Sequence, residues 1–156
     1  MGHKVGLRKK KIAPETTPLA KKDLKAKIKE LRKLEQWAFR LRHRRTDFYE
    51  YLKGVHNLCD WAEPKTSGLV GRRIAKLCHL NVRAGTTPIR IVIDATAPTQ
   101  DRQTKSRWAQ ALEYAISQKA RTTGLKTFFK KHGGSGECAS AMAALRKKRK
   151  RGWARK

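Results

Sequence analysis

Apolar residues recur at helical spacing along most of the chain, most clearly in the segment 23–63. Two series of positions there repeat every seven residues. The first series is Leu24, Leu31, Ala38, Leu52 and Cys59, with Arg45 interrupting it, and the second is Leu34, Leu41, Phe48, Val55 and Ala62. Such series, lying three or four residues apart, are typical of helices that bury one side along their length. The segment is predicted to be a long helix, suited to a coiled coil, or a helical hairpin in which Thr46 caps the second helix.

Shorter amphipathic patterns follow, separated by Gly, Pro and Ser residues. They predict helices after Ser67, around Trp108 as far as about Lys119, after Gly124 and after Ser135. With the first segment they indicate a mainly α protein of about four to six helices.

The helices are expected to divide the chain into four parts. A basic flexible arm covers 1–22, the long helix or hairpin covers 23–63, a helical domain covers 64–144, and a basic tail covers 145–156. Successive short helices also fit a helix-turn-helix motif within the folded part, although the loop expected at 81–87 is longer than the usual turn of that motif.

The segment 88–96 allows two interpretations. Ile89, Ile91 and Ile93 alternate with other residues, which is typical of a strand, here one short strand at 89–94. Thr87 followed by Pro88 is instead a good helix start, because proline suits the first helical position. A lone strand needs a partner, so the strand interpretation predicts pairing with a second copy in a homodimer.

The charge of the chain indicates what kind of partner the protein binds. The 156 residues include 39 Lys and Arg against 12 Asp and Glu, a formal net charge of +27. Such an excess attracts polyanions, of which nucleic acid is the commonest in cells. Both terminal segments are basic, but the part between them also carries an excess of Lys and Arg. The sequence therefore predicts a nucleic-acid-binding protein that contacts the phosphate backbone.

Basic residues gather in clusters that are the candidate binding sites, because guanidinium and ammonium groups suit phosphate. The candidates are Arg40, Arg42, Arg44, Arg45, Arg72, Arg73, Lys76, Arg102, Lys105, Arg107, Lys126, Lys130, Lys131, Arg146, Lys147, Lys148, Arg149, Lys150 and Arg151.

Catalytic and metal-binding patterns are weak by comparison. The run from Gly133 to Gly136 lacks the lysine and the preceding strand of a phosphate loop, and we interpret it as a helix stop followed by a helix start. Cys59, Cys78 and Cys138 lack the close pairing of zinc ligands and fall on apolar helix sides. We therefore expect no enzyme activity, no metal and no cofactor.

The cysteines and the chain start also bear on location. An odd number of cysteines without close pairs argues against a disulfide-stapled secreted protein, and no apolar leader or membrane span is evident. These features predict a cytoplasmic protein, associated with the nucleoid in a bacterium or nuclear in a eukaryote.

A pattern in the last third of the chain resembles uncharacterised bacterial proteins of the kind found with plasmids or phages. The pattern consists of Lys105-Ser106-Arg107-Trp108, Leu112, Tyr114-Ala115, Leu125, Phe128, Gly133-Gly134 and Cys138-Ala139. The resemblance implies a bacterial source and favours DNA as the partner, and it implies no activity. DNA binding is the first hypothesis; an RNA-binding component of a ribonucleoprotein, or a coiled-coil adaptor, are the alternatives.

Overall fold

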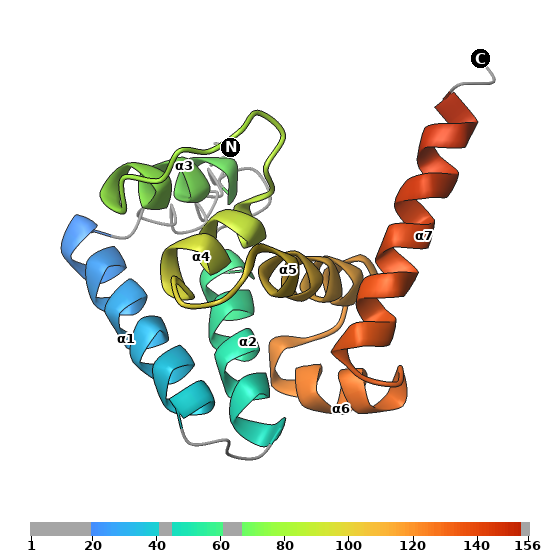
Figure 1. The fold of residues 1–156 in the computed structure, drawn as a ribbon, viewed down its shortest axis with the longest axis horizontal. Coiled ribbons are helices and arrows are strands. Elements are labelled where there is room, and N and C mark those ends of the chain that lie inside the picture. Colours follow the sequence, from blue (N-terminus) through green and yellow to red (C-terminus); the bar gives the residue numbers. More distant parts are fainter. Residues whose placement is uncertain (1–19, 41–44, 61–66, 154–156) are drawn as a thin grey trace, which may run out of the picture.

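The described residues of the computed structural model, 20–40, 45–60 and 67–153, form seven α-helices and one short 3₁₀ helix, with no strand (Figure 1). The mainly α prediction is therefore confirmed. The elements are α1 (Lys21–Arg40), α2 (Arg45–Asp60), α3 (Ser67–Leu77), α4 (Pro88–Thr96), α5 (Arg102–Ser117), η1 (Thr122–Gly124), α6 (Leu125–Lys131) and α7 (Ser135–Trp153).

The first two helices pack side by side and bury their apolar faces inside the same chain (Figure 1). Leu24, Ile28 and Leu31 of α1 are buried, as are Leu52 and Val55 of α2. Burial of these faces between two helices and α4 supplies most of their stability, because short isolated helices are marginal in water. The described heptad positions of α1 and α2 thus serve the core of this domain.

Helix α4 occupies the centre of the molecule, and here the strand interpretation is wrong. Pro88 is the first residue of the helix and Thr87 precedes it in an extended conformation, as the Thr-Pro pair favours. Ile89, Ile91 and Ile93 are all buried although they lie on different sides of the helix. Because α3, α5, α2 and α1 surround α4, the segment needs apolar residues on most sides, and this imitates strand alternation. The route to a homodimer through a paired strand is lost with it.

Polar side chains fix the C-terminal end of α4 against α1 and α2. Arg32 Nε donates to the carbonyl oxygen of Ala95 at 2.8 Å, satisfying one of the carbonyls that a helix end leaves without an intrahelical partner. The hydroxyls of Tyr51 and Thr96 lie 2.8 Å apart in the core, and Thr96 Oγ1 donates to Val92 O at 2.7 Å. Tyr51 therefore donates to Thr96, and both buried hydroxyls are satisfied.

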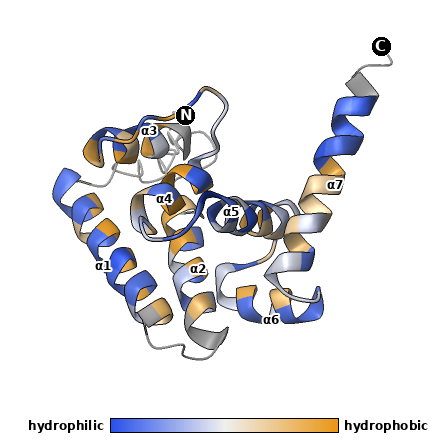
Figure 2. Ribbon diagram, in the orientation of Figure 1, coloured by the Kyte–Doolittle hydropathy of each residue, from blue (hydrophilic) through white to orange (hydrophobic). Residues whose placement is uncertain are grey.

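Helices α5 and α7 form the other half of the fold. Trp108, Leu112 and Ala115 face the core from α5, and α7 packs along α5 through Cys138 and Ala139. The α7 axis then continues past the rest of the domain (Figure 1). Its residues are exposed from 144 to 151, and Figure 2 shows this projecting part as hydrophilic. None of the helices described is both long enough and apolar enough to cross a membrane.

Candidate nucleic-acid interface

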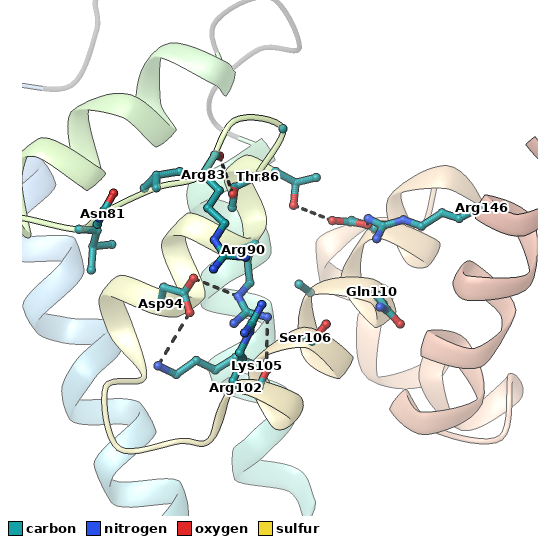
Figure 3. A pocket seen from close by; sticks show the side chains of 16 residues that line it. Asn81, Arg83, Thr86, Arg90, Asp94, Arg102, Lys105, Ser106, Gln110 and Arg146 are labelled. Atoms are coloured by element: carbon teal, nitrogen blue, oxygen red, sulfur yellow. Dashed lines mark hydrogen bonds and ion pairs between the residues drawn. The ribbon is translucent and has the colours of Figure 1, made fainter. Parts of the chain in front are cut away.

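A cleft of about 560 Å³ opens between α4, α5, α7 and the loop that precedes α4 (Figure 3). The loop bends away from α3 at His79, whose φ of 52° is in the left-handed region, and Gly85 follows with a φ of 81°. The residues that line the cleft are Leu80, Asn81, Val82, Arg83, Gly85, Thr86, Thr87, Arg90, Asp94, Arg102, Lys105, Ser106, Ala109, Gln110, Glu113 and Arg146.

The lining is strongly basic. Five of its residues are Lys or Arg and two are acidic, which gives the cleft wall a formal charge of +3. The five come from the loop, α4, α5 and α7, so the fold brings together charges that lie up to 63 positions apart in the sequence. A concave wall of one sign concentrates the field that it makes and attracts anions.

Asp94 organises one side of the cleft. Its Oδ2 accepts from Arg90 Nε at 3.0 Å, and its Oδ1 lies 3.8 Å from Lys105 Nζ (Figure 3). Arg90 Nη1 also donates to the carbonyl oxygen of Arg102 at 3.4 Å. The side chains of Arg90 and Lys105 are only 19% and 14% exposed. One carboxylate thus holds two largely buried cations in place and neutralises only one of them.

Glu113 organises the opposite side. One of its carboxylate oxygens accepts from Thr87 Oγ1 at 2.6 Å, and the other pairs with Arg146 Nη2 of α7. Thr87 makes no side-chain cap to α4, because its hydroxyl is used in this contact. The contact joins the start of α4, the middle of α5 and the second half of α7 around the cleft.

The sequence candidates are distributed unevenly around this site. Arg102, Lys105 and Arg146 line the cleft, and Arg107 is exposed on α5 outside it. Residues on from Arg146, which are Lys147, Lys148, Arg149, Lys150 and Arg151, continue α7 and are exposed.

The remaining candidates do not line the cleft. Arg72 and Lys76 are exposed on α3 and Arg73 is half-buried there, and the exposed lysines of α6 are Lys126, Lys130 and Lys131. Helix α6 adjoins the start of α7, whereas the basic residues of α7 lie at the other end of that helix (Figure 1). Arg40 ends α1 and Arg45 begins α2, while Arg42 and Arg44 lie outside the described residues, as do 1–19 of the N-terminal arm.

Two basic residues of the cleft, Arg83 and Arg90, were not among the candidates. Arg90 had one usable signal, because a helical 88–96 places it four residues before Asp94, the spacing of an ion pair on one helix face. Arg83 is an isolated basic residue in a loop, and only the course of that loop brings it to the cleft.

Groups with shifted pKa values lie outside the cleft. Burial raises the pKa of Tyr51 far above its ordinary value and also raises the pKa of the Cys138 thiol. The pKa of Asp101 is lowered because its carboxylate accepts hydrogen bonds from the side chain and backbone N–H of Thr104 at the start of α5. Among the described residues no three His, Cys, Asp or Glu side chains are grouped as metal ligands.

Comparison with known proteins gives no match: no protein-family model, no curated protein and no solved structure matches this chain.

Proposed function

We propose that the protein binds duplex DNA through its phosphate backbone, using the cleft and the projecting half of α7 as one surface. The observation that carries this proposal is the position of Arg146. This residue lines the cleft through its pair with Glu113, and it is also the first of six consecutive basic residues on α7. The two basic features are therefore continuous.

The projecting part of α7 suits a polyanion on every side. Successive residues of an α-helix are about 100° apart, since 3.6 residues make a turn, so six basic residues in a row surround the axis. No acidic residue lies between Glu137 and Arg151, and among the described residues only Arg146 of the six has an acidic partner, Glu113 of α5. Neutralising phosphates with these side chains releases condensed counterions, which drives binding.

The shape of this surface favours DNA over RNA. The major groove of B-form DNA is wide enough to admit an α-helix, whereas the major groove of A-form RNA is deep and narrow. A helix that projects from its domain with exposed side chains from 144 to 151 can enter the wider groove. The proposed role is binding without catalysis, because both carboxylates of the cleft are held by cations and so serve to position basic groups.

A ligand panel tests the proposal. Fluorescence anisotropy would compare labelled duplex DNA, single-stranded DNA and structured RNA at near-physiological salt, using the whole chain and a variant lacking residues 1–19. Preference for duplex DNA in both proteins supports the proposal. Preference for structured RNA would instead support a ribonucleoprotein component. Absence of binding to all three would reject nucleic-acid binding and leave the adaptor hypothesis.

A further inference from the structure

The cleft is too small for a duplex but has the size of a small-ligand site. Its volume of about 560 Å³ falls within the range of roughly 300–1,000 Å³ that is typical of small-molecule pockets. A duplex can lie across its rim, whereas only a single nucleotide can enter. A cleft of this size is not required for backbone contact along a duplex, so it indicates a second, smaller ligand.

The cleft also holds more positive charge than its own acids neutralise. Asp94 forms ion pairs with both Arg90 and Lys105, and Glu113 forms an ion pair with Arg146. Arg83 and Arg102 make no side-chain ion pair with any described residue, although both line the cleft. This surplus matches a terminal phosphate, which carries a charge of about −1.5 to −2, better than an internal phosphodiester with a single charge.

The surroundings of Lys105 are the strongest indication that the cleft binds an anion. The lysine side chain is 14% exposed, and its nearest carboxylate, Asp94, is 3.8 Å away and already accepts a closer hydrogen bond from Arg90 at 3.0 Å. Removing an ammonium group from water is costly unless charge and hydrogen bonds compensate it. A phosphate beside Lys105 would supply both, and the neighbouring guanidinium of Arg90 has further N–H donors for it.

Uncharged polar groups complete the lining. Asn81 and Gln110 carry amides, and Ser106 carries a hydroxyl (Figure 3). These groups can both donate and accept hydrogen bonds, as the edges of bases and the sugar hydroxyl require. A purely electrostatic phosphate site would not need them.

We propose that the cleft binds one nucleotide through its terminal phosphate, either as a free nucleoside monophosphate or as the phosphorylated end of a DNA strand. The phosphate lies among Arg90, Arg102 and Lys105, and the amides of Asn81 and Gln110 are available to the base. Binding of a DNA end rests on the proposed function, because the phosphorylated end of a strand would reach the cleft from a duplex that lies along α7. Binding of a free nucleoside monophosphate does not.

Two measurements on the whole chain test this inference. Isothermal titration calorimetry would compare deoxyadenosine monophosphate with deoxyadenosine. Anisotropy would compare duplexes of one sequence whose strand ends carry phosphate or hydroxyl groups. We expect the nucleotide to bind and the nucleoside not to bind, and phosphorylated duplexes to bind roughly tenfold more tightly, the size of effect that about one charge-assisted hydrogen bond produces.

A double variant tests the location. Arg83→Gln with Arg102→Gln removes the two cleft cations whose side chains form no ion pair, so the fold should be retained, as circular dichroism would verify. This variant should lose nucleotide binding by at least about tenfold. Lys126→Gln with Lys130→Gln on α6 removes the same charge elsewhere and should bind the nucleotide like the parent protein.

The outcomes separate this inference from the proposed function. Equal binding of phosphate and hydroxyl ends, with no nucleotide binding and intact duplex binding, would overturn the inference alone. Nucleotide binding with no duplex binding would reject the proposed function and assign the cleft to free nucleotides. Equal loss of nucleotide binding in both double variants would show that net charge, and not the cleft, binds the phosphate, and would also overturn the inference.

Discussion

Asp94 accepts a 3.0 Å hydrogen bond from Arg90, one turn earlier on α4, and the same carboxylate lies 3.8 Å from Lys105 of α5. One acidic residue therefore holds cations from two helices at the wall of the cleft. Because it neutralises fewer charges than it positions, the wall stays positive while its geometry is fixed.

Substitution Asp94→Asn should change stability and anion affinity in opposite directions. Losing the carboxylate leaves Arg90 and Lys105 unpaired, so the free energy of unfolding should fall by about 1 kcal/mol, measured by urea denaturation. The formal charge of the wall rises by one, so affinity for duplex DNA should rise roughly threefold.

Glu50→Gln is the matched control for this prediction. It removes the same charge from an exposed pair with Lys53 on α2 and should alter stability by less than about 0.5 kcal/mol. A fall in DNA affinity on Asp94→Asn would contradict this prediction and show that the positioning of Arg90 and Lys105 outweighs the added positive charge.

The projecting half of α7 should be stabilised by DNA. Arg146 and Lys150, and Lys147 and Arg151, are pairs of like charge four residues apart, a spacing that destabilises a helix by roughly 0.2–0.5 kcal/mol per pair. Hydrogen exchange followed by mass spectrometry should show fast exchange for 146–151 in the free protein and slower exchange with duplex DNA. The buried first half of α7, around Cys138, is the internal reference. Unchanged exchange in 146–151 at saturating DNA would remove α7 from the interface.

Much of this fold could be predicted from periodicity, because helices with one buried side keep their period in the sequence. The residues around Trp108 and Leu112 of α5 show this clearly, since only one side is buried. Periodicity fails for α4, where Ile91 is buried together with Ile89 and Ile93 and the polar side is reduced to Arg90 and Asp94. The helix start at Pro88 was the better signal there.

The site could be predicted only in part. The sequence identifies Arg102, Lys105 and Arg146 as members of separate basic clusters, but it gives every such cluster equal weight. Two features distinguish the cleft from the other basic clusters: the loop carrying Arg83, and the carboxylates that hold the cations. Both depend on tertiary packing. The exposed lysines of α6 lie in a similarly basic stretch, but no carboxylate of the described residues forms an ion pair with them.

Tyr51 should make the protein less stable in alkali. Burial raises the pKa of its hydroxyl above the ordinary value of 10.0, so in the folded state it stays protonated where the unfolded chain ionises. Its contribution to stability is complete below pH 10 and is lost as pH rises above that value. Tyr51→Phe should cost about 1 kcal/mol at neutral pH through the lost bond to Thr96.

Urea denaturation at pH 7 and pH 11 would check this prediction, because the comparison of the two proteins cancels the titration of the many lysines. The difference in stability between parent and Tyr51→Phe should shrink at the higher pH. A difference that grows with pH would contradict the raised pKa.

Asp101 should act in the opposite pH range. Its carboxylate accepts hydrogen bonds from the Thr104 hydroxyl and from the backbone N–H groups of Thr104 and Gln103 at the first turn of α5, which lowers its pKa from 3.8. The stability that this cap gives is complete above the unfolded pKa and is lost as pH falls through the lower folded value. Asp101→Ala should therefore be less stable than the parent at pH 6, with a smaller difference at pH 2. An equal difference at both pH values would show that the capping carboxylate carries no charge effect.

The most direct measurement is the salt dependence of duplex DNA affinity for two triple variants and the parent protein. One variant changes Lys147, Lys148 and Arg149 of α7 to Gln, and the other changes Lys126, Lys130 and Lys131 of α6 to Gln, so both lose three charges. Each phosphate contact contributes a slope of about −0.9 to log affinity against log salt. We expect the α7 variant to have a slope shallower by roughly two to three and the α6 variant by less than about one. Equal changes in the two variants, or a parent affinity that is independent of salt, would contradict DNA binding through the cleft and α7.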